Sequence, residues 1–497
     1  MKKNYSEDLT LQIIFLALLI FLSRIPFLWA GFGAEEDSWL LALTAKNISL
    51  SSAYQMSRAP GHPLQEFLYA MLYNKGLSAF TTNLVSAIAS VIATVFFALS
   101  IRNLGLKHYL FSGFAFAFTP IIFVSSTYTI DYMLAMAFVM GSFYFITTPP
   151  CPSPKGRERT HRLLPLWGRL ERGWIWAAIF LGIAIGFRLT SAAMILPFII
   201  LLYPSHKGKR KGIFLFVLAT CLIGGICYLP VVKTYGLSFF TYSDQFPYPN
   251  LPKVFYKLTF GVFGTIGLIT ILCLKISILI KKFRSKEKMI PSEMPATVFW
   301  ASFFVIIIYM ISYFRLPQKS AYFIPAVPFI ILMFRYYLSD RRFKILCVLM
   351  AMSSFLFSIN LTDSLRGSIH SPAAMKFSMA GQEIFVDPLT GSIFSDYTKR
   401  LNKIAYTEEV FQKISHEQQK TVLICGWWFN ELQVRNWEGK ENANVKKVFY
   451  IDQAVIEKYI SEGYGIYYLP EQNLYNDQFS GMNYTDSTAK PYMEIIP

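Results

Sequence analysis

The chain has 497 residues, of which 54% are hydrophobic, 17% aromatic and only 15% charged, and its mean hydropathy is +0.39. Soluble domains carry about 25% charged residues, so the composition excludes a disordered chain, a secreted disulfide scaffold and a soluble nucleic-acid binder. The net charge of +17 is unevenly placed, because residues 1–361 hold 34 Lys and Arg against 13 Asp and Glu, whereas residues 362–497 hold 13 against 17.

Apolar runs close to the roughly 20 residues that cross a bilayer recur as far as residue 361. We predict a polytopic α-helical membrane protein with eleven transmembrane helices. The first run follows Lys2 and Lys3 and has no small-residue cleavage site at its end, so it is predicted to be a retained helix and not a signal peptide. The predicted crossings are 9–30, 79–101, 108–126, 130–147, 174–187, 189–203, 213–232, 254–280, 296–314, 321–338 and 343–361.

The basic residues predict the orientation, because Lys and Arg accumulate in short cytoplasmic loops. With a cytoplasmic N-terminus, the inner loops hold 23 basic residues and the outer loops hold 8. The excess of positive charge is explained by topology, and no nucleic-acid partner is expected. A multi-pass protein of the bacterial inner or plasma membrane follows, with the lipid bilayer as its environment.

One pair of crossings requires an interruption. The segment 173–203 has basic flanks at both ends, so it must leave and return to the same side. Its two halves of about 22 Å are each shorter than the hydrocarbon core of about 30 Å. We therefore predict a break at Gly186-Phe187-Arg188, buried against other helices or lining a water-filled cavity.

Three segments are predicted to lie outside the bilayer. Residues 31–78 form a long first outer loop that carries amphipathic helices. Residues 149–172 are rich in Pro and Arg and read as a low-complexity insertion in an inner loop, without a catalytic role. Residues 362–497 are long enough for one small core. Their apolar runs at 421–428, 447–450 and 465–470 predict strands, and 408–415 and 453–463 predict helices, so we expect a small extracytoplasmic α/β domain.

Ionisable residues at membrane level are scarce, and those that occur are candidates for function. The densest group is Glu35-Glu36-Asp37, where three adjacent acids repel one another, so a helix end has no structural use for them. They are either a solvated loop end or a site for a general base or a metal.

The other candidates also fall on the predicted outer face. A Pro- and Gly-containing turn at 57–63 is expected to bring two basic side chains together near an acid. The remaining candidates come from the outer turn between the third and fourth predicted helices, from the helix break at 186–188 and from the outer turn at 315–322. In chain order these residues are Arg58, His62, Glu66, Asp131, Arg188, Arg315, Lys319 and Tyr322. Acids and cations on one face suit a substrate with a hydroxyl to deprotonate and a phosphate to hold. A solvated His62, and a Lys319 that only neutralises Asp131, are the plainer readings.

The order of these motifs resembles polytopic C-type glycosyltransferases, the superfamily that contains protein O-mannosyltransferases and the lipid A aminoarabinose transferase. The likeness runs over residues 9–361. It is carried by residues 36–47, with an acid pair before an amphipathic helix, and by residues 57–66, 129–133, 186–190 and 319–325.

The resemblance implies an inverting transfer of a sugar from a polyprenyl-phosphate donor to an acceptor hydroxyl on the outer side. It implies that Asp37, with Glu36 second, is the base and that Asp131 is the second acid. Arg188 and Lys319 fall where relatives bind the lipid phosphate, and Arg58 and Arg315 are further candidates for binding that phosphate. A divalent cation between the first-loop acids, including Glu35, and Asp131 stays open, since family members differ in metal use.

Two other classes of function remain open on sequence grounds. A non-enzymatic transporter or flippase for a lipid-linked glycan would use the same cations to guide a lipid phosphate. A membrane scaffold would act through its outer domain. The sequence does not identify the sugar, or whether the acceptor is a lipid, a glycan or a protein.

Overall fold

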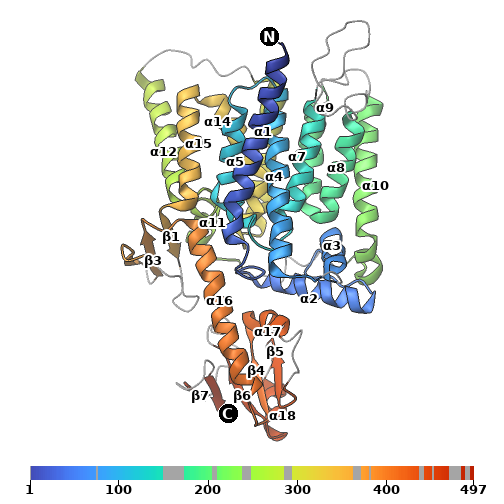
Figure 1. The fold of residues 1–497 in the computed structure, drawn as a ribbon, viewed down its shortest axis with the longest axis vertical. Coiled ribbons are helices and arrows are strands. Elements are labelled where there is room, and N and C mark those ends of the chain that lie inside the picture. The colour runs from blue at the N-terminus through green and yellow to red at the C-terminus, as the bar shows by residue number, and fades with distance from the viewer. Residues whose placement is uncertain are drawn as a thin grey trace.

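Long apolar stretches fold as helices because backbone polar groups in lipid must be satisfied within the segment. The result is a bundle of helices with a smaller mixed part at one end (Figure 1). The computed structural model describes residues 2–73, 76–148, 173–203, 210–237, 248–284, 294–361, 371–379, 382–435, 442–449, 453–469, 483–486 and 493–496. The insertion predicted at 149–172 lies outside these residues.

The bundle and residues 31–78 contain fifteen α-helices and three 3₁₀ helices among the described residues. Residues 31–78 are called the first outer segment after their predicted position. In chain order they are α1 (Lys2–Arg24), η1 (Ile25–Phe27), α2 (Glu36–Ser51), α3 (Pro63–Tyr73), α4 (Ala79–Asn103), α5 (Tyr109–Phe118), α6 (Pro120–Ser125), α7 (Tyr132–Thr147), α8 (Gly173–Phe187), η2 (Leu189–Met194), α9 (Ile195–Leu202), α10 (Arg210–Tyr235), α11 (Leu251–Leu258), α12 (Phe260–Arg284), α13 (Ala296–Arg315), η5 (Ser320–Ala326), α14 (Val327–Tyr337) and α15 (Asp340–Phe355).

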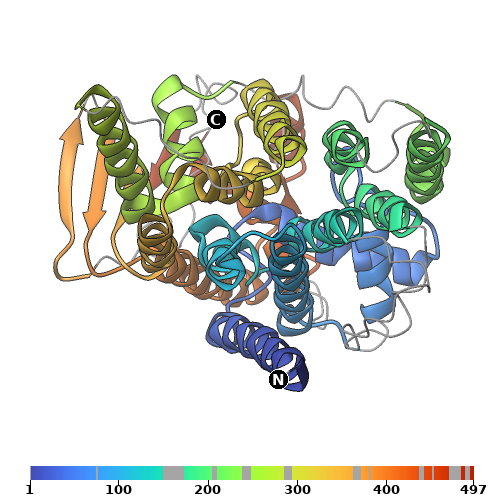
Figure 2. The ribbon, with the colours of Figure 1, turned by 90° about the horizontal axis from the view of Figure 1, so that it is seen from above.

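Six described segments are long and apolar enough to cross a membrane. They are Asp8–Phe27, Ala79–Asn103, Lys211–Tyr235, Phe260–Ile278, Ala296–Arg315 and Ser320–Tyr337. Four shorter apolar helices of 10–17 residues lie beside them, at Tyr109–Phe118, Tyr132–Thr147, Gly173–Phe187 and Leu189–Leu202. A multi-pass membrane protein is confirmed. Seen from above, α1 lies at the margin of the bundle (Figure 2).

Two predicted crossings are interrupted. The run 108–126 divides into α5 and α6 at Thr119, whose extended backbone is the conformation that a following proline imposes. The run 254–280 divides into α11 and α12, because Thr259 separates the short amphipathic α11 from the apolar α12. Apolar length alone does not reveal either interruption.

The last predicted crossing, 343–361, is wrong at its C-terminal end. Helix α15 ends at Phe355, and Ser358–Leu361 forms strand β1, which pairs antiparallel with β3. The apolar run continues through both elements, and a short apolar run fits a helix or a strand equally well. A domain boundary at residue 361 would therefore divide a sheet.

The predicted break in the segment 173–203 is confirmed. Helix α8 ends at Phe187, and Arg188 adopts an extended conformation before η2 begins at Leu189. The preceding Gly186 lies against α3 and α10, because a Cβ there would come within 2.6 Å of Leu64 Cδ1 and 2.7 Å of Cys227 Cβ. The break thus lies where three helices meet.

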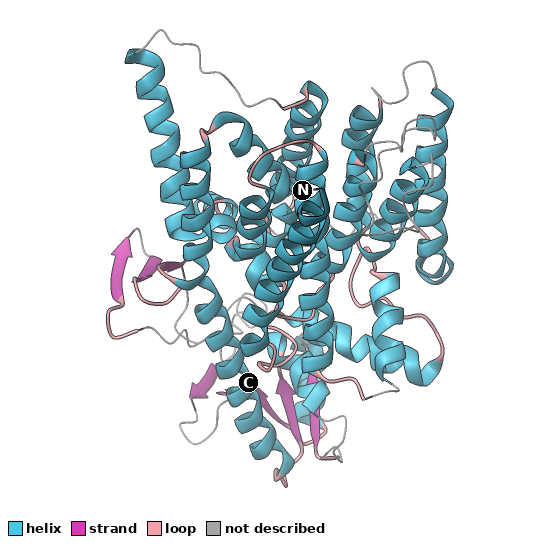
Figure 3. Cartoon of the chain, turned by 45° about the horizontal axis from the view of Figure 1, so that its top comes forward, coloured by secondary structure: helices cyan, strands magenta, loops and turns pink. Residues whose placement is uncertain are grey.

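The C-terminal part contains two small sheets (Figure 3). One has the order β1-β3-β2, with β2 at Met375–Met379 and β3 at Gln382–Asp387. The other has the order β5-β4-β6-β8-β7. Its strands are β4 (Thr421–Ile424), β5 (Val445–Val448), β6 (Gly465–Tyr468), β7 (Asn483–Asp486) and β8 (Met493–Ile496). The predicted strands and the β-α-β unit are confirmed, since β5 and β6 both run parallel to β4, with α18 (Gln453–Ser461) between them in sequence.

A long helix, α16 (Ser392–Ser415), connects the bundle to this α/β unit (Figure 1). Its Arg400 is buried and donates to the carbonyls of Phe27 and Thr127 at 3.3 and 3.0 Å. Helix α17 (Phe429–Arg435) packs against α2 through Val434. The C-terminal part is therefore docked on the first outer segment. The predicted class, a polytopic helical membrane protein with a small C-terminal α/β part, is confirmed.

Candidate active site

The first outer segment is tied to the bundle by its backbone carbonyls. The buried Asn83 amide donates to the carbonyls of Leu28 and Gly31, both at 2.9 Å, and the Thr129 amide donates to the carbonyl of Phe32 at 2.8 Å. The start of α2 is thereby held beside the turn that precedes α7. This contact brings the first-loop acids close to Asp131.

The three adjacent acids occupy the N-terminus of α2, with Glu35 at the N-cap position and Glu36 and Asp37 in the first turn. Negative charge is stabilised there by the helix dipole and the unpaired backbone N–H groups. The expectation that a helix end has no structural use for them is therefore wrong. Structure alone accounts for acids at this position, and function must be argued from their partners.

The turn at residues 57–63 is built by buried groups around it. The Glu66 carboxylate accepts hydrogen bonds from the Ser57 amide at 2.8 Å and the Ser57 hydroxyl at 2.6 Å, while the Tyr228 hydroxyl of α10 donates to the Gly61 carbonyl at 2.8 Å. Burial raises the pKa of Glu66. Glu66 thus shapes the turn, which places Arg58 and His62 against the bundle.

A cluster of charged side chains and one histidine surrounds Asp131, which is fully buried. Its other members are Glu35, Asp37, Arg58, His62, Arg188 and Lys319. The Asp131 Oδ2 atom accepts from Arg188 Nη1 at 2.5 Å and lies 3.6 Å from His62 Nδ1, and the Oδ1 atom accepts from Arg58. A buried carboxylate needs a charged or hydrogen-bonding partner, and the structure supplies two guanidinium groups. The helix break at Arg188 is what aims one of them inward.

His62 is a neutral member of the cluster. Its Nδ1 atom lies 3.0 Å from the Phe187 carbonyl, which requires Nδ1 to carry the proton. Burial lowers the pKa of His62 to about 4. The side chain is 3% exposed, so the plainer reading of a solvated outer-loop histidine is wrong.

Lys319 lies in the turn between α13 and η5 and connects that turn to the acids at the start of α2. Its Nζ atom donates to Glu35 Oε2 at 2.5 Å and to Asp37 Oδ2, and Arg58 Nε lies 3.6 Å from the same Asp37 oxygen. The plainer reading, in which Lys319 neutralises Asp131, is wrong, because Arg58 and Arg188 take that place.

The neighbouring cations determine the protonation state of Asp37. Burial raises its pKa, but Lys319 and Arg58 lower it by more, so the pKa of Asp37 lies well below its usual range. Asp37 is therefore ionised and is a weak base while both cations remain beside it.

Two further predicted residues have different outcomes. Tyr322 lies beside the cluster, with its ring 5.4 Å from the Arg188 guanidinium, and the Tyr132 ring lies 4.4 Å from it on α7. Arg315 is exposed at the end of α13 and pairs with no carboxylate among the described residues. The structure does not bring Arg315 to the cluster.

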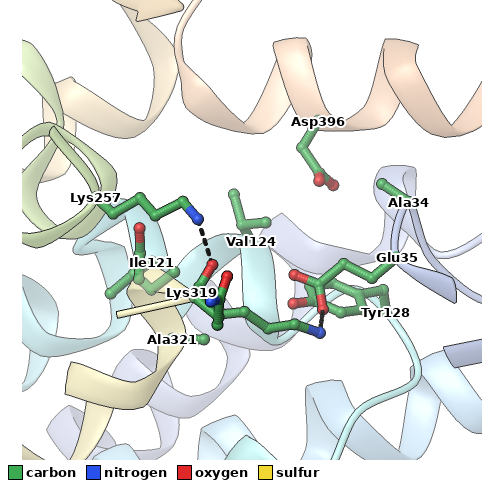
Figure 4. A pocket seen from close by; sticks show the side chains of 11 residues that line it. Ala34, Glu35, Ile121, Val124, Tyr128, Lys257, Lys319, Ala321 and Asp396 are labelled. Atoms are coloured by element: carbon green, nitrogen blue, oxygen red, sulfur yellow. Dashed lines mark hydrogen bonds and ion pairs between the residues drawn. The ribbon is translucent and has the colours of Figure 1, made fainter. Parts of the chain in front are cut away.

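A cavity of about 230 Å³ adjoins the cluster, and some of the residues that line it were not predicted from the sequence (Figure 4). Lys257 of α11, Tyr128 and Asp396 of α16 line it together with Glu35 and Lys319. Lys257 was overlooked because the predicted crossing 254–280 included it. Asp396 comes from the C-terminal part, and no local pattern connects it to the first loop.

Glu36 has a different partner from Asp37. Its Oε1 atom accepts from the Asn430 amide of α17 at 2.6 Å, which is a contact between residues 394 positions apart. Lys403 of α16 pairs with Glu431 at 3.1 Å beside it. Adjacent acids on one helix turn thus face different elements, Asp37 toward the cations and Glu36 toward the C-terminal part.

The carboxylates of the cluster do not fit a metal centre. Glu35, Asp37 and Asp131 each point at an ammonium or guanidinium group, which occupies the position that a cation would take. Within the described ranges, no group of three or more His, Cys, Asp or Glu is placed to hold a metal ion.

Comparisons with known proteins bear on the family and the fold of the chain. A family model described as the N-terminal domain of the protein O-mannosyl-transferase TMEM260 matches residues 46–212, which include the turn at 57–63, Asp131 and Arg188. No curated protein matches the chain. The matched residues are about a third of the sequence.

Three solved structures are similar over most of the chain. ArnT from Cupriavidus metallidurans bound to undecaprenyl phosphate has a TM-score of 0.55 at 12% identity, covering 98% of both chains. The apo state of the same protein has a TM-score of 0.46 at 10% identity, covering 99% of this chain and 98% of that one. The oligosaccharyltransferase of Archaeoglobus fulgidus, tethered to an acceptor peptide, has a TM-score of 0.44 at 12% identity, covering 92% of this chain and 68% of that one.

The family model and the fold shared with undecaprenyl-phosphate-bound ArnT confirm the resemblance to C-type membrane glycosyltransferases. Residues 46–212 are similar to a protein O-mannosyl-transferase domain, and the chain as a whole shares the fold of ArnT. At 12% identity the structural likeness carries the fold alone. The donor, the acceptor and the catalytic residues must be argued from the cluster itself.

Proposed function

We propose that this protein is a membrane glycosyltransferase that moves a sugar from a polyprenyl-phosphate donor to an acceptor hydroxyl on the extracytoplasmic side. The observation that carries the proposal is the joint pairing of Asp37 with Lys319 and Arg58. A carboxylate held between two cations at the end of a helical bundle is suited to a reaction that both removes a proton and releases an anion.

The proposed roles follow from the contacts. Asp37 accepts the proton of the acceptor hydroxyl while that oxygen attacks the anomeric carbon on the face opposite the phosphate. The bond from that carbon to the phosphate oxygen breaks, and the electron pair leaves with the polyprenyl phosphate, so the configuration inverts. Lys319, Arg188 and Arg58 stabilise the charge that develops on the phosphate.

The resting ion pairs give the donor a second role. The phosphate of the donor competes with Asp37 for Lys319 and Arg58, and each contact it gains removes a charge that lowers the pKa of Asp37. Donor binding therefore raises the pKa of Asp37 toward its usual value. The base gains strength when the substrate is present.

Asp37 is preferred to Glu36 as the base because of where the two carboxylates point. Glu36 is hydrogen-bonded to Asn430 of α17, whereas Asp37 accepts a hydrogen bond from Lys319, which lines the cavity. Asp131 is held by two arginines in a fully buried position, which suits a residue that orients Arg58 and Arg188.

The proposal implies particular partners and a location. The donor is a polyprenyl-phosphate-linked sugar, since nucleotide sugars are cytoplasmic and the site is proposed to face outward. The acceptor is a lipid, glycan or protein hydroxyl. We place the protein in a bacterial inner or plasma membrane, with its N-terminus in the cytoplasm and its C-terminal part outside.

The test is conversion of the donor by the purified protein in lipid nanodiscs. Polyprenyl phosphates that carry single hexoses or pentoses are supplied together with membrane lipid and protein extracts that provide acceptor hydroxyls, and mass spectrometry measures the release of free polyprenyl phosphate. The proposal predicts release by the wild type. A transporter would move the lipid across a proteoliposome membrane with its sugar bond intact, and that outcome would replace the proposal.

A further inference from the structure

The cavity beside the cluster has walls from both the bundle and the C-terminal part. Glu35 and Lys319 line it from the side of the cluster, Lys257 lines it from α11, and Asp396 lines it from α16. In Figure 4 the side chains of Lys257, Glu35 and Asp396 point into the same space from three sides. Lys319 also donates to Asp37, so the cavity shares a lining residue with the ion pair of the proposed base.

The position of Asp396 is determined by its neighbour one helical turn later. The buried Arg400 side chain pairs with Asp396 Oδ2 at 2.9 Å and is itself held by the carbonyls of Phe27 and Thr127. Because these carbonyls belong to the bundle, α16 is fixed relative to the cluster at this point. The Asp396 Oδ1 atom takes no part in the ion pair and is available to a group in the cavity.

The groups around the cavity are of mixed hydrogen-bonding type. Asp396 accepts, the Lys257 ammonium and the Tyr128 hydroxyl donate, and Val124 and Ala321 supply apolar wall. Burial lowers the pKa of Lys257 to about 8, and its Nζ atom donates to the Gln318 carbonyl, which leaves further N–H groups to donate. A volume of about 230 Å³ is below the roughly 300–1,000 Å³ of sites for drug-sized ligands.

We propose that this cavity holds the sugar ring of the donor and that Asp396, from the C-terminal part, binds a sugar hydroxyl and contributes to the choice of sugar. This inference rests on the proposed function and extends it to the recognition of the sugar. A single sugar ring matches the cavity in size, and its hydroxyls donate and accept as the lining groups require. The C-terminal part thereby supplies one wall of the substrate site.

The test compares two ligands on one protein. Full-length wild type, Asp396→Asn and the control Glu409→Gln are reconstituted in nanodiscs, and each is titrated with undecaprenyl phosphate and with undecaprenyl-phosphate-linked mannose, glucose and arabinose. Glu409 is an exposed acid on the same helix, paired with Lys413 at 3.2 Å, so its replacement removes the same charge outside the cavity. Thermal unfolding of each variant is measured in parallel.

We expect Asp396→Asn to weaken binding of the best sugar-bearing lipid by about tenfold or more, the effect of losing a hydrogen bond to a charged group. Binding of the bare lipid phosphate should be unchanged, and Glu409→Gln should match the wild type for both ligands. An equal loss for both lipids would show that Asp396 only holds Arg400, and a loss confined to the bare lipid would make the cavity a phosphate site. Either result, or no loss at all, overturns the inference.

The wild type separates this inference from the proposed function. If the wild type binds no lipid phosphate, with or without a sugar, the proposed function falls and the sugar site falls with it. If it binds the sugar-bearing lipids no better than the bare lipid, the donor proposal stands and the cavity assignment is wrong.

Discussion

At the scale of single residues, the cluster is a set of carboxylates and cations in balanced pairs. Asp131 is shared by Arg58 and Arg188, and Asp37 is shared by Arg58 and Lys319. Arg58 therefore connects the two halves. Removing one member of a buried pair leaves its partner as an uncompensated buried charge. The resulting loss of stability is typically far larger than the net contribution of the pair.

Lys319 is the cation best placed to exchange Asp37 for a phosphate. Replacing it with alanine should weaken binding of a polyprenyl-phosphate sugar by about 1.5–3 kcal/mol, the scale of a charge-assisted hydrogen bond. Equilibrium binding in nanodiscs measures this. Lys253→Ala removes an exposed cation from the neighbouring α11 and should leave the affinity unchanged. An unaltered affinity in Lys319→Ala would remove Lys319 from the phosphate site.

His62 gives the folded protein a specific pH dependence. Its pKa falls from 6.5 to about 4 on burial, so the unfolded chain binds a proton between these values that the folded chain does not. The contribution of His62 to stability is therefore complete above pH 6.5 and is lost as the pH falls to 4, by about 3 kcal/mol in total.

The measurement is the unfolding midpoint of wild type and His62→Asn between pH 7.5 and 4.5. Asparagine retains a donor for the Phe187 carbonyl but does not titrate. The difference between the two profiles should shrink steadily as the pH falls below about 6.5. Parallel profiles over this window would mean that His62 is not buried as a neutral group.

At the scale of elements, the break between α8 and η2 shows what the sequence can and cannot supply. Basic flanks at both ends of the segment 173–203 and its insufficient length predicted the break at 186–188, and the structure has it there. The division of 254–280 into α11 and α12 had no such signal, because no flanking charge conflicted with a single crossing. Lys257 was therefore not predicted as a site residue.

Gly186, directly before this break, is in close contact with α3 and α10. Gly186→Ala should lower stability by about 1–3 kcal/mol, the usual effect of overpacking, because the added Cβ would meet Leu64 and the Cβ of Cys227. Gly225→Ala in α10 is the matched control, since nothing lies within 4 Å of a Cβ there and alanine favours a helix. Thermal unfolding compares the two, and equal midpoints would contradict the close approach of α3, α8 and α10.

At the scale of the whole molecule, the C-terminal part is joined to the first outer segment by contacts that no local pattern contains. Asn430 binds Glu36, and Ile404 and Val434 pack on the cluster formed by Phe32, Trp39 and Ala42. The sequence predicted β4, β5, β6, α18 and the last turns of α16, because these depend on local periodicity, but it did not predict β1, β2, β3, β7, β8 or α17. It predicted neither the docking nor the place of Asp396 in the cavity, because both depend on residues such as Glu35 and Glu36 that are distant in the sequence.

The arrangement of the two ends yields a topology prediction. The N-terminus and the C-terminal part lie at opposite ends of the bundle (Figure 1). With the six cysteines replaced, a cysteine at the exposed Ser461 of α18 should react with a membrane-impermeant thiol reagent in intact cells. A cysteine at the exposed Lys107, between α4 and α5, should react only after permeabilisation. The reverse pattern would invert the protein and remove the outward-facing site.

The most direct test of the central claim is to measure donor affinity and turnover on the same Asp37→Asn protein. Asparagine keeps the shape of the side chain and loses its basicity, and loss of a general base typically costs roughly 10²–10⁴ in rate. Glu36→Gln, one residue earlier and bound to Asn430, is the control. We predict that Asp37→Asn binds the polyprenyl-phosphate sugar yet releases polyprenyl phosphate at least about a hundredfold more slowly, whereas Glu36→Gln retains most activity. Turnover by Asp37→Asn close to that of the wild type would contradict the account.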